Sequence, residues 1–69
     1  MDTLDTSLGT ARDGTKSLSA RLKAVEHLCN VARRSPNENN REKAIDYLQR
    51  IADDWWITPE VRERAQDCL

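Results

Sequence analysis

The sequence is poor in aromatic residues and glycine. Its 69 residues include no Phe, and aromatics make up only 4%, so a hydrophobic core must come mainly from Leu, Ile, Val and Ala. A chain of this size buries a small core and usually needs a staple or a partner for stability. The two glycines, Gly9 and Gly14, form no phosphate-binding loop. The composition therefore predicts one small domain without a nucleotide site.

Long apolar runs and a set of cysteines are also missing. The longest uninterrupted apolar run covers residues 55–57, far below the roughly 20 residues of a membrane span or the roughly 7–15 of a signal-peptide core. Two cysteines, Cys29 and Cys68, are too few to frame a secreted fold, so we expect both to be reduced. We therefore predict a soluble, cytoplasmic protein with no membrane partner.

The net charge is close to zero, but the first half of the chain is slightly positive and the second half slightly negative. Residues 1–34 carry six Lys and Arg against four Asp and Glu, and residues 35–69 carry five against eight. Neither half has the uncompensated cations that tracking a phosphate backbone requires. Nucleic acid is therefore not the expected partner.

Groups for catalysis or metal binding are scarce. The only histidine, His27, falls on the polar side of its predicted helix, whereas Cys29 points to the other side, so the two cannot pair as base and nucleophile. A distant pairing of His27 with Cys68 stays open. No spacing resembles a zinc or calcium site. We expect no enzyme activity, no cofactor, no metal and no small-molecule substrate.

Helical periodicity begins at residue 17. Apolar residues recur at steps of three and four, which predicts helices over about 17–34, 38–55 and 59–68. Residues 1–16 are rich in Thr, Ser, Asp and Gly and predict a flexible arm; an arm that orders on a partner is the alternative. The predicted fold is all-α: a three-helix bundle, or a minimal stack of helical repeats, over residues 17–69.

Start signals for the second and third helices differ in clarity. For the second, Ser35-Pro36 and an approximate capping box of Asn39 with Glu42 compete, which places the start between residues 37 and 40. For the third, we expect the Thr58 side chain to accept a bond from the first free amides, followed by Pro59 at the first helical position.

The sequence repeats itself with an offset of 20. Residues 21–34 (RLKAVEHLCNVARR) agree with residues 41–54 (REKAIDYLQRIADD) at eight of fourteen positions, conservative pairs included, and residues 61–65 echo residues 40–44. Two unrelated amphipathic helices would also agree at apolar positions, so convergence is an alternative. A true repeat would stack each helix on its neighbour.

The segment ITPEVRERA (residues 57–65), with Leu69 after it, carries a family resemblance. Its Pro, Val-Arg, Ala and Leu resemble the short signature of HEAT-like repeats, over residues 57–69 and loosely over 21–54. A HEAT unit is a longer pair of helices, so the length of this chain departs from the family. The resemblance implies a helical scaffold that binds proteins and has no active site or cofactor.

The end of the second predicted helix holds the candidate partner-binding residues. Trp55 continues the helical stripe and is expected in the core, whereas Trp56 either emerges as a binding hot spot or covers the junction with Ile57. Asp53 and Asp54 oppose the negative end of the helix dipole, which suggests either salt bridges to arginines or recognition of a partner. The candidate surface comprises Tyr47, Asp53, Asp54, Trp55, Trp56 and Ile57.

These patterns predict a small non-catalytic protein–protein interaction module. It would bind itself, as a homodimer, or regulate a partner protein as an adaptor. Opposite charges at matching repeat positions, Arg33-Arg34 and Asp53-Asp54, suggest head-to-tail or symmetric self-pairing. The alternative is a helix-turn-helix that places Arg62, Arg64 and Gln66 in a DNA groove, although acidic residues on the same helix oppose it.

Overall fold

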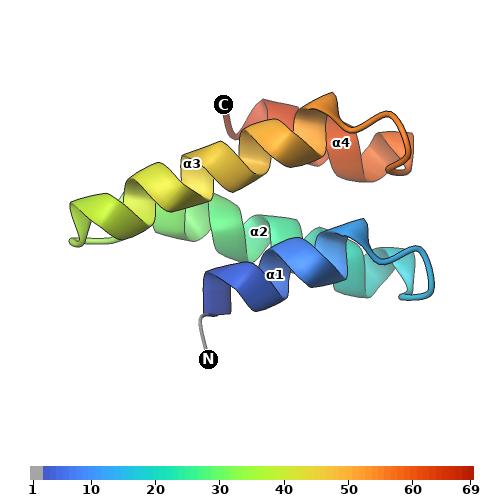
Figure 1. Ribbon diagram of the computed structural model, residues 1–69, viewed down its shortest axis with the longest axis horizontal. Helices are drawn as coiled ribbons and strands as arrows, with labels where there is room; N and C mark the ends of the chain where they lie inside the picture. Colours follow the sequence, from blue (N-terminus) through green and yellow to red (C-terminus); the bar gives the residue numbers. More distant parts are fainter. Residues whose placement is uncertain (1–2) are drawn as a thin grey trace.

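The computed structural model describes residues 3–69 and is all-helical over that range. Its helices are α1 (Thr3–Arg12), α2 (Leu18–Arg34), α3 (Glu38–Asp53) and α4 (Pro59–Asp67). Successive helices run in opposite directions, and the longer α2 and α3 pack between the shorter α1 and α4 (Figure 1). No helix in the described part of the chain is long and apolar enough to cross a membrane.

The first helix corrects the prediction of three helices behind a flexible arm over residues 1–16. Thr3–Arg12 is helical, and its Leu4 and Ala11 are buried in the common core, with Leu8 packed against it. Met1 and Asp2 lie outside the described residues. Local propensity opposed this helix, but apolar contacts with α2 and α3 outweigh propensity in short helices.

The other three helices begin where the sequence places them. Ser17 accepts a hydrogen bond from the Ala20 amide (3.2 Å) and caps α2. Asn37, rather than Asn39, caps α3 by accepting from the amide of Asn40 (3.2 Å). Pro59 opens α4, but the Thr58 side chain accepts no amide hydrogen bond. The prediction for that side chain is wrong because its hydroxyl is engaged elsewhere, by an arginine of α2.

Aliphatic side chains from α2, α3 and α4 form the centre of the core. The largest fully buried ones are Leu28, Leu48, Ile51, Val25 and Val61. Small residues fill the places where helices approach closely, as Ala44 and Ala65 show with no exposed surface. The core is therefore aliphatic, as the absence of Phe requires.

A disulfide joins α2 to the end of α4. Cys29 and Cys68 are bonded, with a sequence separation of 39 and 5.7 Å between their Cα atoms. The expectation of two reduced thiols is therefore wrong. Sequence spacing could not show the pairing, because it depends on α4 folding back along α2. The bond supplies the staple that a small core lacks.

One arginine recurs at the same place in each of the last three helices, four residues after the cap. Arg21 donates from Nε to the carbonyl of Ala11 at the end of α1 (3.1 Å), and Arg41 donates to the carbonyl of Ser35 at the end of α2 (2.7 Å). The corresponding Arg62 has its Nε buried without a hydrogen-bond partner among the described residues. The matched arginines of the sequence repeat thus fasten a helix start to the end of the helix before it.

Candidate protein-binding surface

A tight turn (residues 54–57, the tryptophan turn) links α3 to α4. The Asp54 carbonyl accepts a hydrogen bond from the amide of Ile57 (3.1 Å), and the Asp54 carboxylate accepts one from the amide of Trp56 (3.1 Å). This is the pattern by which Asp fixes the first position of a β-turn. Trp55 and Trp56 therefore occupy the two corner positions.

Both corner tryptophans point into solvent. Trp55 is 70% exposed and Trp56 is 78% exposed, and their rings stack with centroids 4.2 Å apart. The prediction that Trp55 lies in the core is wrong, because α3 ends at Asp53 and the helical spacing no longer applies beyond it. Trp56 therefore emerges at the surface, as the first of its two alternatives requires, and does not cover the junction with Ile57.

Ile57 takes the core position that the sequence assigned to Trp55. Its side chain is only 3% exposed and belongs to the main apolar cluster. The Thr58 hydroxyl, next along the chain, accepts a hydrogen bond from Arg21 Nη1 (3.0 Å). The tryptophan turn is therefore anchored immediately after its exposed corner, and Ile57 is not available to a partner.

Tyr47 also belongs to the core rather than to the surface. It is 9% exposed, and its hydroxyl donates a hydrogen bond to the Asp5 carboxylate of α1. That hydrogen bond, followed by burial, raises the pKa of Tyr47 above its ordinary value. The cations of Lys43 and Arg50 lie 5.6 and 5.7 Å from the ring centroid. Tyr47 thus holds α1 against α3.

The two aspartates at the end of α3 have different roles. Asp54 pairs with Arg12 of α1 (3.6 Å), not with the arginines of α2 or α4 that the sequence suggested. Arg12 lies in the segment that the sequence predicts to be a flexible arm, so the sequence gives no reason to expect this pair. Asp53 is exposed and has no ion pair or hydrogen bond from its side chain in the part of the chain described. Its carboxylate is free for a partner.

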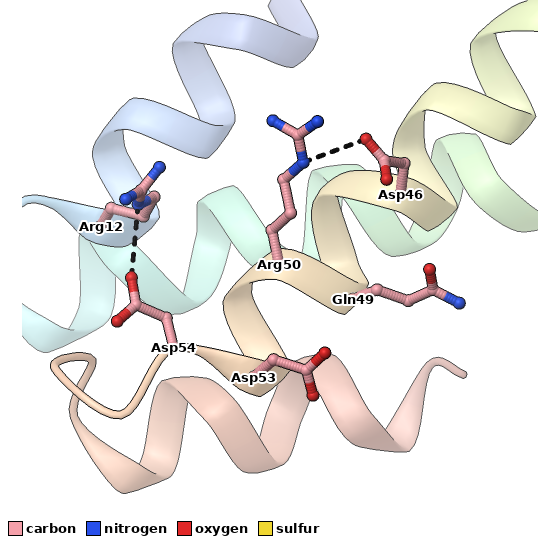
Figure 2. Close-up of a pocket in the computed structure, with 6 residues that line it drawn as sticks. All are labelled: Arg12, Asp46, Gln49, Arg50, Asp53 and Asp54. Atoms are coloured by element: carbon pink, nitrogen blue, oxygen red, sulfur yellow. Dashed lines mark ion pairs between the residues drawn. The ribbon is translucent and has the colours of Figure 1, made fainter.

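Beside the turn lies an open, charged depression of about 470 Å³. Figure 2 shows Arg12 reaching toward Asp54, and Arg50 toward Asp46 (3.1 Å), while the Asp53 and Gln49 side chains point away from Arg12. These two ion pairs satisfy most of its charge internally. The depression therefore offers little to a charged small molecule beyond Asp53.

Chemically reactive groups are not gathered near this surface. In residues 3–69, no group of three or more His, Cys, Asp and Glu side chains could hold a metal ion. The distant pairing of His27 with Cys68 has no thiolate, because Cys68 is bonded to Cys29. Arg64, which the helix-turn-helix alternative would place in a DNA groove, is already paired with Glu26 of α2 (2.9 Å).

In comparisons of the chain with protein-family models, with curated proteins and with solved structures, nothing matched.

Proposed function

We propose that the chain is a small, non-catalytic protein–protein interaction module that docks through Trp55 and Trp56. The observation that carries this proposal is the exposure of a stacked tryptophan pair at the corner of an anchored turn. Tryptophan is the residue type most enriched among binding hot spots, where one side chain can contribute about 2 kcal/mol or more.

Stability of the fold does not account for this pair. Ile57 fills the core position after the turn, and Asp54 closes the turn through its own carboxylate. A polar residue at either corner would serve the β-turn as well or better. Leaving two large apolar rings in water favours association, because burying each against a partner removes apolar surface from solvent.

The turn also presents the pair in a fixed arrangement. Two hydrogen bonds close it, and Asp54 is further held by Arg12. Stacked rings lose little conformational freedom when a partner covers them, which lowers the entropic cost of binding. The partner is either a second copy of this chain or another protein for which the module acts as an adaptor or regulator. A scaffold of stacked helices is also what the HEAT-like resemblance implies.

The test is a quantitative pull-down with tagged wild-type chain, W55A/W56A and I45A, in which untagged copies of the chain are counted as well. Ile45 is a matched control because it is apolar, 40% exposed and on α3, about 12 Å of helix rise from Asp53. We expect specific proteins to be lost with W55A/W56A and retained with I45A. Equal recoveries with all three would contradict the proposal.

The disulfide bears on where the module acts. The sequence predicts a cytoplasmic location from the lack of a long apolar run, but a stable disulfide is rare in that compartment. The location stays a prediction, and thiol labelling of the protein in its native cells decides it. Protected cysteines would favour an oxidising compartment, whereas labelled ones would agree with the cytoplasm.

A further inference from the structure

Two carboxylates that the molecule itself leaves unpaired flank the tryptophan turn in sequence. Asp53 precedes the turn and Glu60 follows it in the first turn of α4; both are exposed, and neither side chain has an ion pair or hydrogen bond among residues 3–69. The faces of the indole rings also carry negative electrostatic potential. This surface therefore fits a partner that offers guanidinium groups, which can stack on Trp and pair with carboxylates.

The same chain carries such groups at its other end. Arg33 and Arg34 are the last two residues of α2, and both are exposed. Neither guanidinium has an ion pair or hydrogen bond in the described part of the chain. The neighbouring Arg41 differs, because it is fastened to the Ser35 carbonyl. Arg33 and Arg34, the arginine pair, are thus available.

These two surfaces cannot meet within one molecule. The turn between α2 and α3 and the turn between α3 and α4 lie at opposite ends of the long axis, which extends 31 Å (Figure 1). Asp53 and the arginine pair therefore stand at the two ends of the fold. The complement of each is found on another copy of the chain.

We propose that the chain self-associates head to tail, with the arginine pair of one copy stacked on Trp55 and Trp56 of the next and paired with Asp53. The inference rests on the proposed function and names its partner. Such a contact is heterologous, so each pair of molecules keeps one free tryptophan turn and one free arginine pair, and the assembly can grow.

A symmetric contact between two tryptophan turns is disfavoured by charge. It would bring Asp53 and Glu60 of both copies into one interface, and like charges at an interface are costly. The two arginines that line the depression beside the turn cannot compensate without breaking existing pairs, because Arg12 is held by Asp54 and Arg50 by Asp46. The head-to-tail arrangement instead joins opposite charges.

Mixing two defective variants tests the polarity of the contact. W55A/W56A loses only the tryptophan surface, and R33E/R34E loses only the arginine pair. In sedimentation velocity at several protein concentrations, we expect the sedimentation coefficient of the wild type to rise with concentration. Each variant alone should sediment as a monomer. An equimolar mixture should form a dimer that does not grow further, because each variant supplies the one surface that the other lacks.

A charge exchange tests the pairing itself. R33E/R34E should weaken self-affinity by about tenfold or more. Adding D53R to that variant should recover part of the loss, because it restores the charge pairing but not the stacking of guanidinium groups on the rings. I45A should behave as the wild type, and far-ultraviolet circular dichroism should show unchanged helix content in every variant.

Several results would overturn the inference: a wild type that stays monomeric, a mixture that stays monomeric, or a D53R addition that recovers nothing. A monomeric wild type would leave the proposed function intact if the pull-down still loses other proteins with W55A/W56A. Equal recoveries in that pull-down would instead remove the proposed function as well.

Discussion

The two short outer helices, α1 and α4, are fastened to the same central pair by different means. α4 has a covalent bond, Cys68 to Cys29, in addition to its buried Val61 and Ala65. α1 has no covalent link among the residues described and depends on apolar packing with polar contacts. The polar contacts are the hydrogen bond of Tyr47 to Asp5 and the ion pair of Arg12 with Asp54.

The difference matters for the candidate surface, because the tryptophan turn lies between these two attachments. Asp54 is held by Arg12 from the α1 side, and Thr58 is held by Arg21, which also binds the Ala11 carbonyl of α1. Loss of either outer helix would free one side of the turn. One buried arginine, Arg21, therefore couples a helix held by noncovalent contacts to a covalently held one.

The largest expected effect comes from removing the disulfide. The chain-entropy model gives about 4 kcal/mol for a closed loop of this length, set by the sequence separation of 39. We expect C29A/C68A to lower the free energy of unfolding by an amount of that order in urea denaturation followed by circular dichroism. In hydrogen exchange, the backbone amides of α4 should lose more protection than those of α1.

Reduction of the wild type with a thiol provides the control for that variant. The reduced wild type should unfold at nearly the same urea concentration as C29A/C68A, because both lack only the covalent link. If the amides of α1 lose as much protection as those of α4, the two helices are not fastened independently, contrary to this prediction.

The next effect is expected at Arg21, which serves both outer helices. R21M keeps an apolar stem and removes the guanidinium, so the Ala11 carbonyl and the Thr58 hydroxyl lose their donor. Hydrogen bonds to charged groups contribute about 1.5–3 kcal/mol each. The apolar Met side chain offsets part of the loss, so we take the low end of that range for the two bonds and expect a loss of about 3 kcal/mol in the free energy of unfolding. The tryptophan emission spectrum should change as well, because the turn loses an anchor.

Arg41 offers a matched control from the equivalent repeat position. It is less buried and makes one hydrogen bond, to the Ser35 carbonyl at the other end of the molecule. R41M should therefore cost less than R21M and leave tryptophan emission unchanged. Equal losses for the two variants would show that Arg21 does not couple the outer helices.

The sequence predicted the elements that carry their own local signals. Helices expected over 17–34, 38–55 and 59–68 are found at Leu18–Arg34, Glu38–Asp53 and Pro59–Asp67. The errors arise where tertiary contacts decide. The pairing of Cys29 with Cys68 and the capture of Asp54 by Arg12 both join residues far apart in sequence.

The candidate site was predicted in part. Trp56 and Asp53 are exposed as a partner-binding role requires, whereas Tyr47 and Ile57 lie in the core. Trp55 was expected in the core and Ile57 at the surface, and the structure shows the opposite. The cause is that α3 ends two residues earlier than predicted, at Asp53 and not at residue 55. Periodicity alone does not show where a helix stops, and α3 has no glycine or proline at its end to mark it.

The smallest expected effect comes from Gly9, one of the residues whose low helix propensity led the sequence to predict a flexible arm in place of α1. Gly9 lies inside α1, its φ is negative, and a Cβ there would meet no atom within 4 Å. Glycine in a helix costs about 0.5–1 kcal/mol relative to alanine, so G9A should raise the free energy of unfolding by that amount and increase hydrogen-exchange protection in α1. Gly14 is the matched control, because its surroundings are equally open but it lies outside the helices. If G9A and G14A act alike, the gain reflects a less flexible unfolded chain, and glycine in the helix is not what weakens α1.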